Sequence, residues 1–186
     1  MQHPYEKDEY RLYRDCKQGN HAAQRWIYNA YYPMAVAVCL RYVGSVSDAE
    51  EVVADCFISF FKALQQTFRY QDGGSMKAYL KKIAVNQSLM FLRKQRHSFE
   101  EMDERYEQVA DVDLDALGQL SAKDILKVLQ RLPPGYRTVF NMYVLEGYSH
   151  AEIAEALHIS EATSRTQLMK AKLQLQKILS TYERYV

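Results

Sequence analysis

The stretch SHAEIAEALHISEATSRTQLMKAKLQLQKI, residues 149–178, decides the fold of the carboxy-terminal part of this chain. Ser149 and Glu152 have the spacing of a capping box, in which serine and glutamate side chains satisfy free amides at the start of a helix. The apolar residues behind it recur at helical spacing: Ile153, Ala154 and Leu157. A tight turn at 158–160 follows, and Ser160 can cap a second helix. Short helix, turn and longer helix predict a helix-turn-helix, whose second helix enters the major groove of DNA.

The second helix separates into two faces at about 100° per residue. We expect one face to lie toward the core: Ser164, Leu168, Ala171, Leu175 and Ile178. We expect the opposite face to lie toward DNA: Thr166, Met169, Lys170, Leu173 and Lys177, flanked by Arg165, Gln167 and Lys172. Arginine and lysine can contact guanine edges or phosphates, and glutamine can pair with adenine. A surface helix with solvated lysines is the alternative, but the capping signals and the matched turn favour DNA binding.

Composition and motifs exclude several classes of protein. The chain has 186 residues, enough for one medium domain or two small ones, and no apolar run long enough to cross a bilayer. Its amino terminus has no apolar signal core, so we expect a cytoplasmic protein. The three cysteines lie far apart without neighbouring ligands, which predicts reduced thiols and no metal or cofactor. No phosphate loop, nucleophile elbow or HExxH motif occurs, so we expect no catalytic residues and no enzyme.

A net charge of +1 conceals opposed patches along the chain. Residues 73–99 and 162–182 contain no acid, whereas acids crowd between Glu100 and Asp115. The acidic stretch has sparse apolar residues and no steady period, which is typical of a linker. We therefore predict a first domain at 1–97, a linker at 98–118 and a second domain at 119–186.

Both predicted domains are all-α, because apolar spacing of three and four dominates and strand-like alternation is rare. In the first, residues 15–42 predict one or two helices broken near Pro33. A second capping box at 47–50 starts a helix with this apolar stripe: Val53, Cys56, Phe57, Phe60 and Leu64. Residues 71–74 predict a loop and 75–96 a further helix.

The second domain is predicted to hold four helices. A capping pattern at 121–124 begins the first helix, and Pro133-Pro134-Gly135 ends it. Gly147 ends the next helix, because glycine is common just past a helix end. The helix-turn-helix follows.

Three stretches, in order, resemble segments of the extracytoplasmic-function (ECF) sigma factors, bacterial proteins that direct RNA polymerase to promoters. DAEEVVADCFISFFK, residues 48–62, is similar to the family's polymerase-binding helix. AYLKKIAVNQSLMFLRKQ, residues 78–95, is similar to its minus-10 and strand-opening segment. Residues 132–179 resemble its region that recognises the minus-35 element. The resemblance implies a sigma factor that binds core polymerase, at the beta-prime clamp helices and the beta flap, and promoter DNA.

The resemblance assigns site residues position by position. Those of the polymerase-docking stripe are Asp48, Glu51, Asp55 and Ile58. Those of the minus-10 set are Phe68, Tyr70, Lys81, Lys82, Asn86, Arg93 and Lys94, with the two aromatics placed to stack on a flipped base. Those of the minus-35 set are Arg165, Thr166, Gln167, Lys170 and Lys172. The plainer alternatives are a solvated face for the acidic stripe and buried aromatics at a helix end for Phe68 and Tyr70.

Several residues depart from the family pattern. Ala54 replaces a glutamine, Val85 an arginine and Met90 an aspartate, and Tyr79 stands where tryptophan is common. Ser164 replaces an inward valine and Gln167 an arginine. These departures predict an unusual promoter preference and altered detail in the polymerase and minus-10 contacts.

A stand-alone helix-turn-helix repressor or activator is the rival interpretation. The acidic helix followed by a basic one argues against it, since a repressor needs no such pair. By resemblance alone we also expect an anti-sigma partner, often membrane-bound, which would hold the chain at the inner membrane, and an acidic linker that runs through the polymerase. The absence of a heptad seam predicts a monomer.

Overall fold

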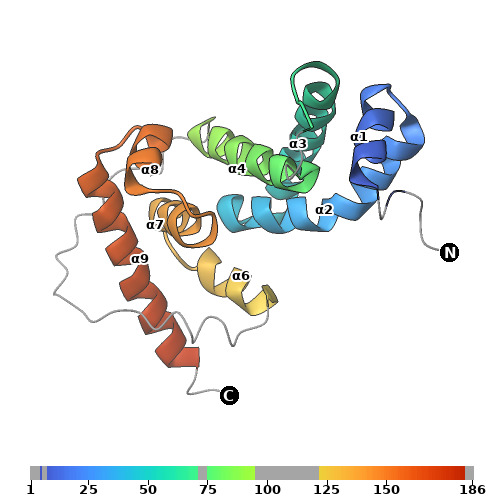
Figure 1. Cartoon of the computed structure of the whole chain (residues 1–186). Coiled ribbons are helices and arrows are strands. Elements are labelled where there is room, and N and C mark those ends of the chain that lie inside the picture. The colour runs from blue at the N-terminus through green and yellow to red at the C-terminus, as the bar shows by residue number, and fades with distance from the viewer. Residues whose placement is uncertain (1–4, 6–7, 71–74, 95–121, 183–186) are drawn as a thin grey trace. The chain divides into compact units, whose positions relative to one another are not determined.

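The computed structural model describes residue 5 and residues 8–70, 75–94 and 122–182. All regular structure in these residues is helical, which confirms the all-α prediction (Figure 1). The chain divides into two compact units, residues 1–94 and 95–186. They are called unit 1 and unit 2 below. The linker predicted at 98–118, the loop at 71–74 and the cap at Ser121 lie outside the described residues.

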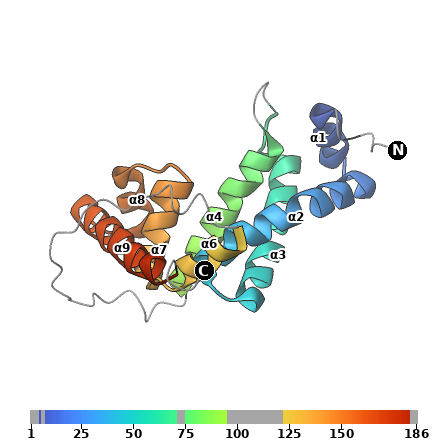
Figure 2. The same ribbon diagram turned by 90° about the horizontal axis from the view of Figure 1, so that it is seen from below.

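The described residues of unit 1 form four helices: α1 (Glu9–Lys17), α2 (His21–Val43), α3 (Val46–Gln66) and α4 (Met76–Lys94). Helices α2, α3 and α4 pack against one another, and α1 packs on α2 and α3 (Figure 2). All four helices contribute apolar side chains to one core. Its largest fully buried members are Leu12, Ile27, Tyr42, Phe60, Leu64, Met76 and Leu80.

The start of α3 corrects a prediction. The cap is Ser45, whose hydroxyl accepts from the backbone amide of Asp48 at 3.2 Å, and not Ser47. The reason lies in the preceding turn: Gly44 ends α2 in the left-handed conformation at φ 82°, and Ser45 is already extended. The chain therefore reverses within two residues, and the first serine after the turn meets the free amides.

The break predicted near Pro33 is also wrong, because α2 runs through this proline without interruption. The break lies at 18–20 instead, where Gly19 has φ 78° and Asn20 caps α2 by accepting from the amides of Ala22 and Ala23. An internal proline costs a helix about 3 kcal/mol. Apolar side chains on both sides of Pro33 are buried against the neighbouring helices, and this packing offsets the cost.

Unit 2 holds α6 (Ala122–Gln130), α7 (Pro134–Phe140), α8 (His150–Leu157) and α9 (Glu161–Tyr182). A single π-helical segment, η1 (Asn141–Leu145), continues α7, so the described part is a four-helix unit, as predicted. Pro134 stands in the first turn of α7, and Gly147 follows η1 at φ 78°, which confirms both predicted helix boundaries. The largest fully buried side chains are Leu129, Phe140, Met142, Ile153 and Leu175.

The three cysteines are buried and free, as predicted. Burial raises the pKa of Cys16 to about 12. Among the described residues, no cluster of His, Cys, Asp and Glu has the geometry to hold a metal ion. None of the described helices is both long and apolar enough to cross a membrane.

Candidate functional site

The helix-turn-helix of unit 2 has the local contacts that its sequence predicts. The Ser149 amide donates to Glu152 Oε2 at 2.8 Å and the Glu152 amide to Ser149 Oγ at 3.3 Å, which completes the capping box. Helix α8 ends at His158, which adopts the left-handed conformation at φ 57° and ψ 44°. The Thr163 amide donates to Ser160 Oγ at 3.0 Å, so Ser160 caps α9.

A buried polar contact joins the two helices of this motif. Ser164 on α9 is 0% exposed, and its Oγ lies 2.9 Å from Nδ1 of His150 at the start of α8. The imidazole also stacks on Tyr143, with ring centroids 4.5 Å apart. Burial lowers the pKa of His150, as does the nearby Arg165 charge, while Glu161 raises it. The neutral ring is therefore favoured. The serine that departs from the family valine thus has a partner, and the pair is called the His150–Ser164 contact below.

The two faces of α9 largely follow the prediction. Ser164, Leu168, Ala171 and Leu175 are buried, whereas Ile178 is half-buried. On the other side Arg165, Thr166, Met169 and Lys177 are exposed, and Gln167, Lys170 and Lys172 are half-buried. Leu173 was predicted to face outward and is buried, at 4% exposure. That prediction is wrong because α9 packs against α6 as well as α7 and α8, so more than one side of the helix is covered.

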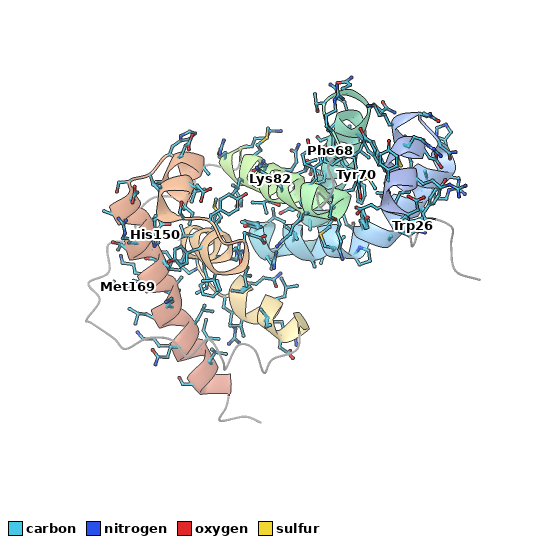
Figure 3. All side chains as sticks on the ribbon, in the orientation of Figure 1. Trp26, Phe68, Tyr70, Lys82, His150 and Met169 are labelled. Atoms are coloured by element: carbon cyan, nitrogen blue, oxygen red, sulfur yellow. The ribbon has the colours of Figure 1, made fainter. Side chains whose placement is uncertain are left out.

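Three of the outer side chains of α9 contact neighbouring groups. Arg165 Nη2 lies 2.7 Å from Glu161 Oε2, one turn earlier, and both side chains are exposed. The Thr166 hydroxyl donates to the Ala162 carbonyl at 3.0 Å. Lys170 Nζ lies 6.0 Å from the centre of the Tyr136 ring. Met169, labelled in Figure 3, lies between these groups in sequence and is 46% exposed. The face therefore offers cations, a hydroxyl and an apolar side chain.

Helix α3 carries the predicted docking stripe on its outer side. Glu51, Asp55 and Ile58 are exposed and Asp48 is half-buried. Their spacing of three, four and three residues places all four along one line of the helix. Ile58 is 67% exposed and adds an apolar side chain to the acidic stripe. The inner side of α3 is buried in the unit: Ala49, Val52, Val53, Cys56, Phe57, Phe60 and Leu64.

Helix α4 carries the predicted basic residues. Lys82, Asn86, Arg93 and Lys94 are exposed and Lys81 is half-buried. Lys82 is labelled in Figure 3. Val85, which stands where the family has arginine, is 1% exposed and belongs to the core, where an apolar side chain fits. Met90, in place of an aspartate, is 49% exposed on the outer side. These two departures from the family pattern therefore affect different sides of α4: Val85 changes the buried side and Met90 changes the exposed side.

Phe68 and Tyr70 lie in an aromatic cluster at the end of α3 (Figure 3). The Tyr13 ring contacts both, with centroid distances of 5.6 Å to Phe68 and 5.6 Å to Tyr70, the latter stacked. Phe68 also lies 4.7 Å from Tyr79, and Tyr70 lies 5.6 Å from Tyr10. Both predicted residues are half-buried, so each presents part of its ring to solvent and part to other rings.

Helix α1 contributes two residues that the sequence did not predict. They contact the segments before and after residues 71–74. Tyr13 Oη donates to the Phe68 carbonyl at 3.1 Å, and the Met76 amide donates to Glu9 Oε1 at 2.8 Å. No sequence signal identifies them, because each contact spans more than fifty residues. The His150–Ser164 contact spans only 14 residues, but the local pattern around Ser164 does not indicate that a polar partner lies on the neighbouring helix.

Comparison with known proteins gives matches to two family models. The model "Sigma-70 region 2" matches residues 27–98, and "Sigma-70, region 4" matches residues 122–175. These ranges contain α3 with α4 and the helix-turn-helix, respectively.

Two curated relatives and one solved structure are similar to the chain. "RNA polymerase sigma factor SigV" of Bacillus subtilis is 30% identical over 146 residues, which cover 78% of this chain and 84% of that protein. "ECF RNA polymerase sigma factor SigE" of Mycolicibacterium smegmatis is 29% identical over 76% of this chain, which spans only 56% of that relative. The sigma factor RpoE in complex with the anti-sigma factor NepR from Bartonella quintana is 20% identical, with a TM-score of 0.49, covering 84% of this chain and 96% of that one.

Proposed function

Since the chain belongs to the ECF family of RNA polymerase sigma factors, we propose that it binds core polymerase through the outer side of α3 and promoter DNA through α4 and α9. The family is regulatory and non-catalytic, and it directs promoter-specific initiation.

The observation that carries the proposal is the pairing of two outer surfaces within unit 1. Helix α3 presents acids with an exposed isoleucine, and the neighbouring α4 presents basic residues and an amide. An acidic stripe with one apolar member suits a basic partner protein, whereas the basic face suits phosphates. A repressor that acts on DNA alone has no use for the first surface.

On α4 we assign the phosphate contacts of the minus-10 region to Lys82, Arg93 and Lys94, which are exposed, with Lys81 at the edge of the same surface. Exposed Asn86 can read a base edge once the strands separate. Phe68 and Tyr70 offer the part of each ring that other aromatics leave uncovered to an unstacked base.

On α9 we assign minus-35 recognition to the exposed surface around Arg165 and Thr166, with half-buried Gln167, Lys170 and Lys172 at its sides. Arginine pairs with guanine through two donors, and Glu161 at 2.7 Å supports the Arg165 side chain in the free protein. The Thr166 methyl group and the hydroxyl provide further contacts to bases or phosphates.

Functional regions at 1–97, 98–118 and 119–186 complete the proposal, with an acidic linker that suits a basic channel of the polymerase. The anti-sigma partner and the monomeric state stay predictions. The sigma factor in the Bartonella quintana structure is bound to such a partner.

Two measurements with purified core polymerase test the proposal: the affinity of the protein for the polymerase, and run-off transcription. Glu50 and Glu51 are adjacent, exposed and chemically identical, but a helix turns them about 100° apart, so only Glu51 lies in the stripe. We expect Glu51→Lys to lower the affinity for core polymerase about tenfold or more, as like charges meet, and Glu50→Lys to change it less than twofold.

The triple reversal of Asp48, Glu51 and Asp55 to Lys should abolish promoter-specific transcripts from genomic fragments while duplex DNA binding by α9 persists. Equal effects of Glu50→Lys and Glu51→Lys would remove the stripe from the interface. Duplex DNA binding without any binding of wild-type protein to core polymerase would support the repressor interpretation instead.

A further inference from the structure

Helix α1 contacts both segments that flank residues 71–74, and it does so from two residues one helical turn apart. On the side before them, Tyr13 Oη donates to the Phe68 backbone carbonyl at 3.1 Å. On the side after them, Glu9 Oε1 accepts from the Met76 amide at 2.8 Å and from Ser75 Oγ at 3.4 Å. One rigid helix therefore fixes the spacing between the end of α3 and the start of α4.

The contact at Met76 acts as a helix cap supplied from elsewhere in the chain. The Lys77 amide donates to Ser75 Oγ at 3.1 Å, and Glu9 takes the neighbouring Met76 amide, so two of the first free amides of α4 are satisfied. A carboxylate at this end also interacts favourably with the helix dipole. Met76 itself is 0% exposed, which anchors the backbone that Glu9 binds.

The contact at Phe68 is built around a buried ring. Tyr13 is 7% exposed, and its ring contacts the rings of both Phe68 and Tyr70. Its hydroxyl accepts from Lys17 Nζ at 3.4 Å while donating to the Phe68 carbonyl. Ring packing and the hydrogen bond together set the orientation of Phe68 and Tyr70, and so the direction in which the uncovered part of each ring faces.

We infer that Glu9 and Tyr13 are positioning residues for promoter opening, which hold Phe68, Tyr70 and the start of α4 in the arrangement that accepts an unstacked base. The inference rests on the proposed function of these segments in strand opening. The region 2 match begins at residue 27, so α1 lies outside the matched part of the chain. The contacts of α1, and not the family match, assign Glu9 and Tyr13 to this role.

The test compares duplex and pre-opened templates with the full-length protein and core polymerase. The template is a promoter fragment found by run-off transcription, used once as a duplex and once with a mismatched bubble over the minus-10 element. For the double variant Glu9→Ala with Tyr13→Phe we expect heparin-resistant complexes to fall about tenfold on the duplex, the order expected from losing two hydrogen bonds. On the bubble, where the strands are already apart, we expect a change of less than about twofold.

Matched variants separate positioning from folding. Tyr10→Phe removes a hydroxyl from the same helix while keeping a ring that contacts Tyr70, and Tyr10 is 58% exposed, so it should open duplex promoters like the wild type. Glu9→Gln keeps an acceptor oxygen and should recover most of the activity that Glu9→Ala loses. Hydrogen exchange at the Met76 amide should speed up in Glu9→Ala and not in Tyr10→Phe.

Three results would overturn the inference. Unchanged opening of the duplex by the double variant would show that the spacing is set elsewhere. Equal losses on duplex and bubble, together with weaker core binding, would show a purely structural role for α1. Failure of the wild-type protein to open any promoter with core polymerase would instead refute the proposed function, and the inference with it.

Discussion

The interiors of the two units differ in chemistry. Among the described residues, and leaving aside the buried tyrosines, unit 1 buries a single polar or charged residue, Ser88, whose hydroxyl donates to the Ala84 carbonyl within its own helix at 2.8 Å. The described part of unit 2 is smaller and yet buries four: Arg137, Thr138, Asn141 and Ser164.

An apolar core stabilises in proportion to the area it buries and tolerates small shifts between helices. Buried polar groups contribute less net stability, but each is satisfied in few arrangements, so they restrict how the helices can pack. In unit 1 the core beneath α3 and α4 therefore depends mainly on apolar packing, and the hydrogen bonds of Glu9 and Tyr13 act at its edge. In unit 2 polar contacts, the His150–Ser164 contact above all, restrict how α8 packs on α9, the helix that carries the proposed minus-35 surface.

The largest effect is expected from truncating the core of unit 1. Phe60 is 0% exposed and its ring contacts Phe61 and Tyr79, so Phe60→Ala should lower the free energy of unfolding of unit 1 by about 3–5 kcal/mol. Trp26 is the only tryptophan of the chain and lies in unit 1, so its fluorescence during urea unfolding measures this unit. Half-buried Phe61→Ala is the control and should cost clearly less. Similar losses in the free energy of unfolding for both variants would mean that Phe60 contributes no more to the core of unit 1 than half-buried Phe61 does.

The second prediction concerns the buried guanidinium of Arg137. Burial lowers its pKa, its Nη1 donates to the Gln130 carbonyl at 3.3 Å, and no hydrogen-bond partner for Nε lies among the described residues. Arg137→Ala leaves a cavity and should cost about 2–3 kcal/mol, whereas Arg137→Met fills the space and should cost less than about 1 kcal/mol. Hydrogen exchange of α7 and α9 reports the stability of unit 2. A cost for methionine as large as that for alanine would give the charge itself a stabilising role.

The third prediction concerns the His150–Ser164 contact. Ser164→Val restores the usual family side chain but leaves His150 Nδ1 without its 2.9 Å partner, so we expect a loss of about 1–2 kcal/mol in unit 2 and a weaker preference for the minus-35 sequence. A double-mutant cycle with His150→Ala should give a coupling of about 1 kcal/mol. If the effects of the two substitutions on the free energy of unfolding are additive, the two side chains are neighbours without energetic coupling.

The same contact predicts a direction of pH dependence. The pKa of His150 is lower in the folded protein than its ordinary value, so the unfolded chain binds the proton more readily. The contribution of His150 to stability is therefore fully present above about pH 6.5 and is lost as the pH falls through the lower, folded pKa. Urea unfolding of the wild type and of His150→Ala at several pH values should show this loss only in the wild type. A loss of the same size in both would assign it to other groups.

How far the sequence predicted the molecule depends on the range of the contacts. The α8 capping box, the turn at 158–160 and the glycine at 147 were predicted correctly, because each depends on residues a few positions apart. Pro33 was misjudged because packing across α2 outweighs a local helix-breaking signal. Leu173 was misjudged because no periodicity reveals that α6 also covers α9.

For the candidate surfaces too, features that depend on short-range spacing were predicted and long-range contacts were not. The stripes on α3 and α4 come from spacing within one helix, so sequence places them on the outside correctly. Glu9 as the cap of α4 depends on a contact across 67 positions, and nothing in the residues near either partner indicates it. Which of the exposed residues bind polymerase or DNA stays a prediction for the experiments above.

The smallest expected effect lies at the turn of the helix-turn-helix. His158 ends α8 at φ 57°, a left-handed conformation that costs a residue with a Cβ roughly 1 kcal/mol relative to glycine. His158→Gly should therefore stabilise unit 2 by about 0.5–1 kcal/mol, while His158→Val, which is β-branched, should destabilise it. Hydrogen exchange in unit 2 measures the change in stability for both variants. If glycine destabilises the unit, the exposed imidazole makes a contribution that outweighs the backbone strain, and the turn would then resemble the rest of unit 2 in relying on polar side chains.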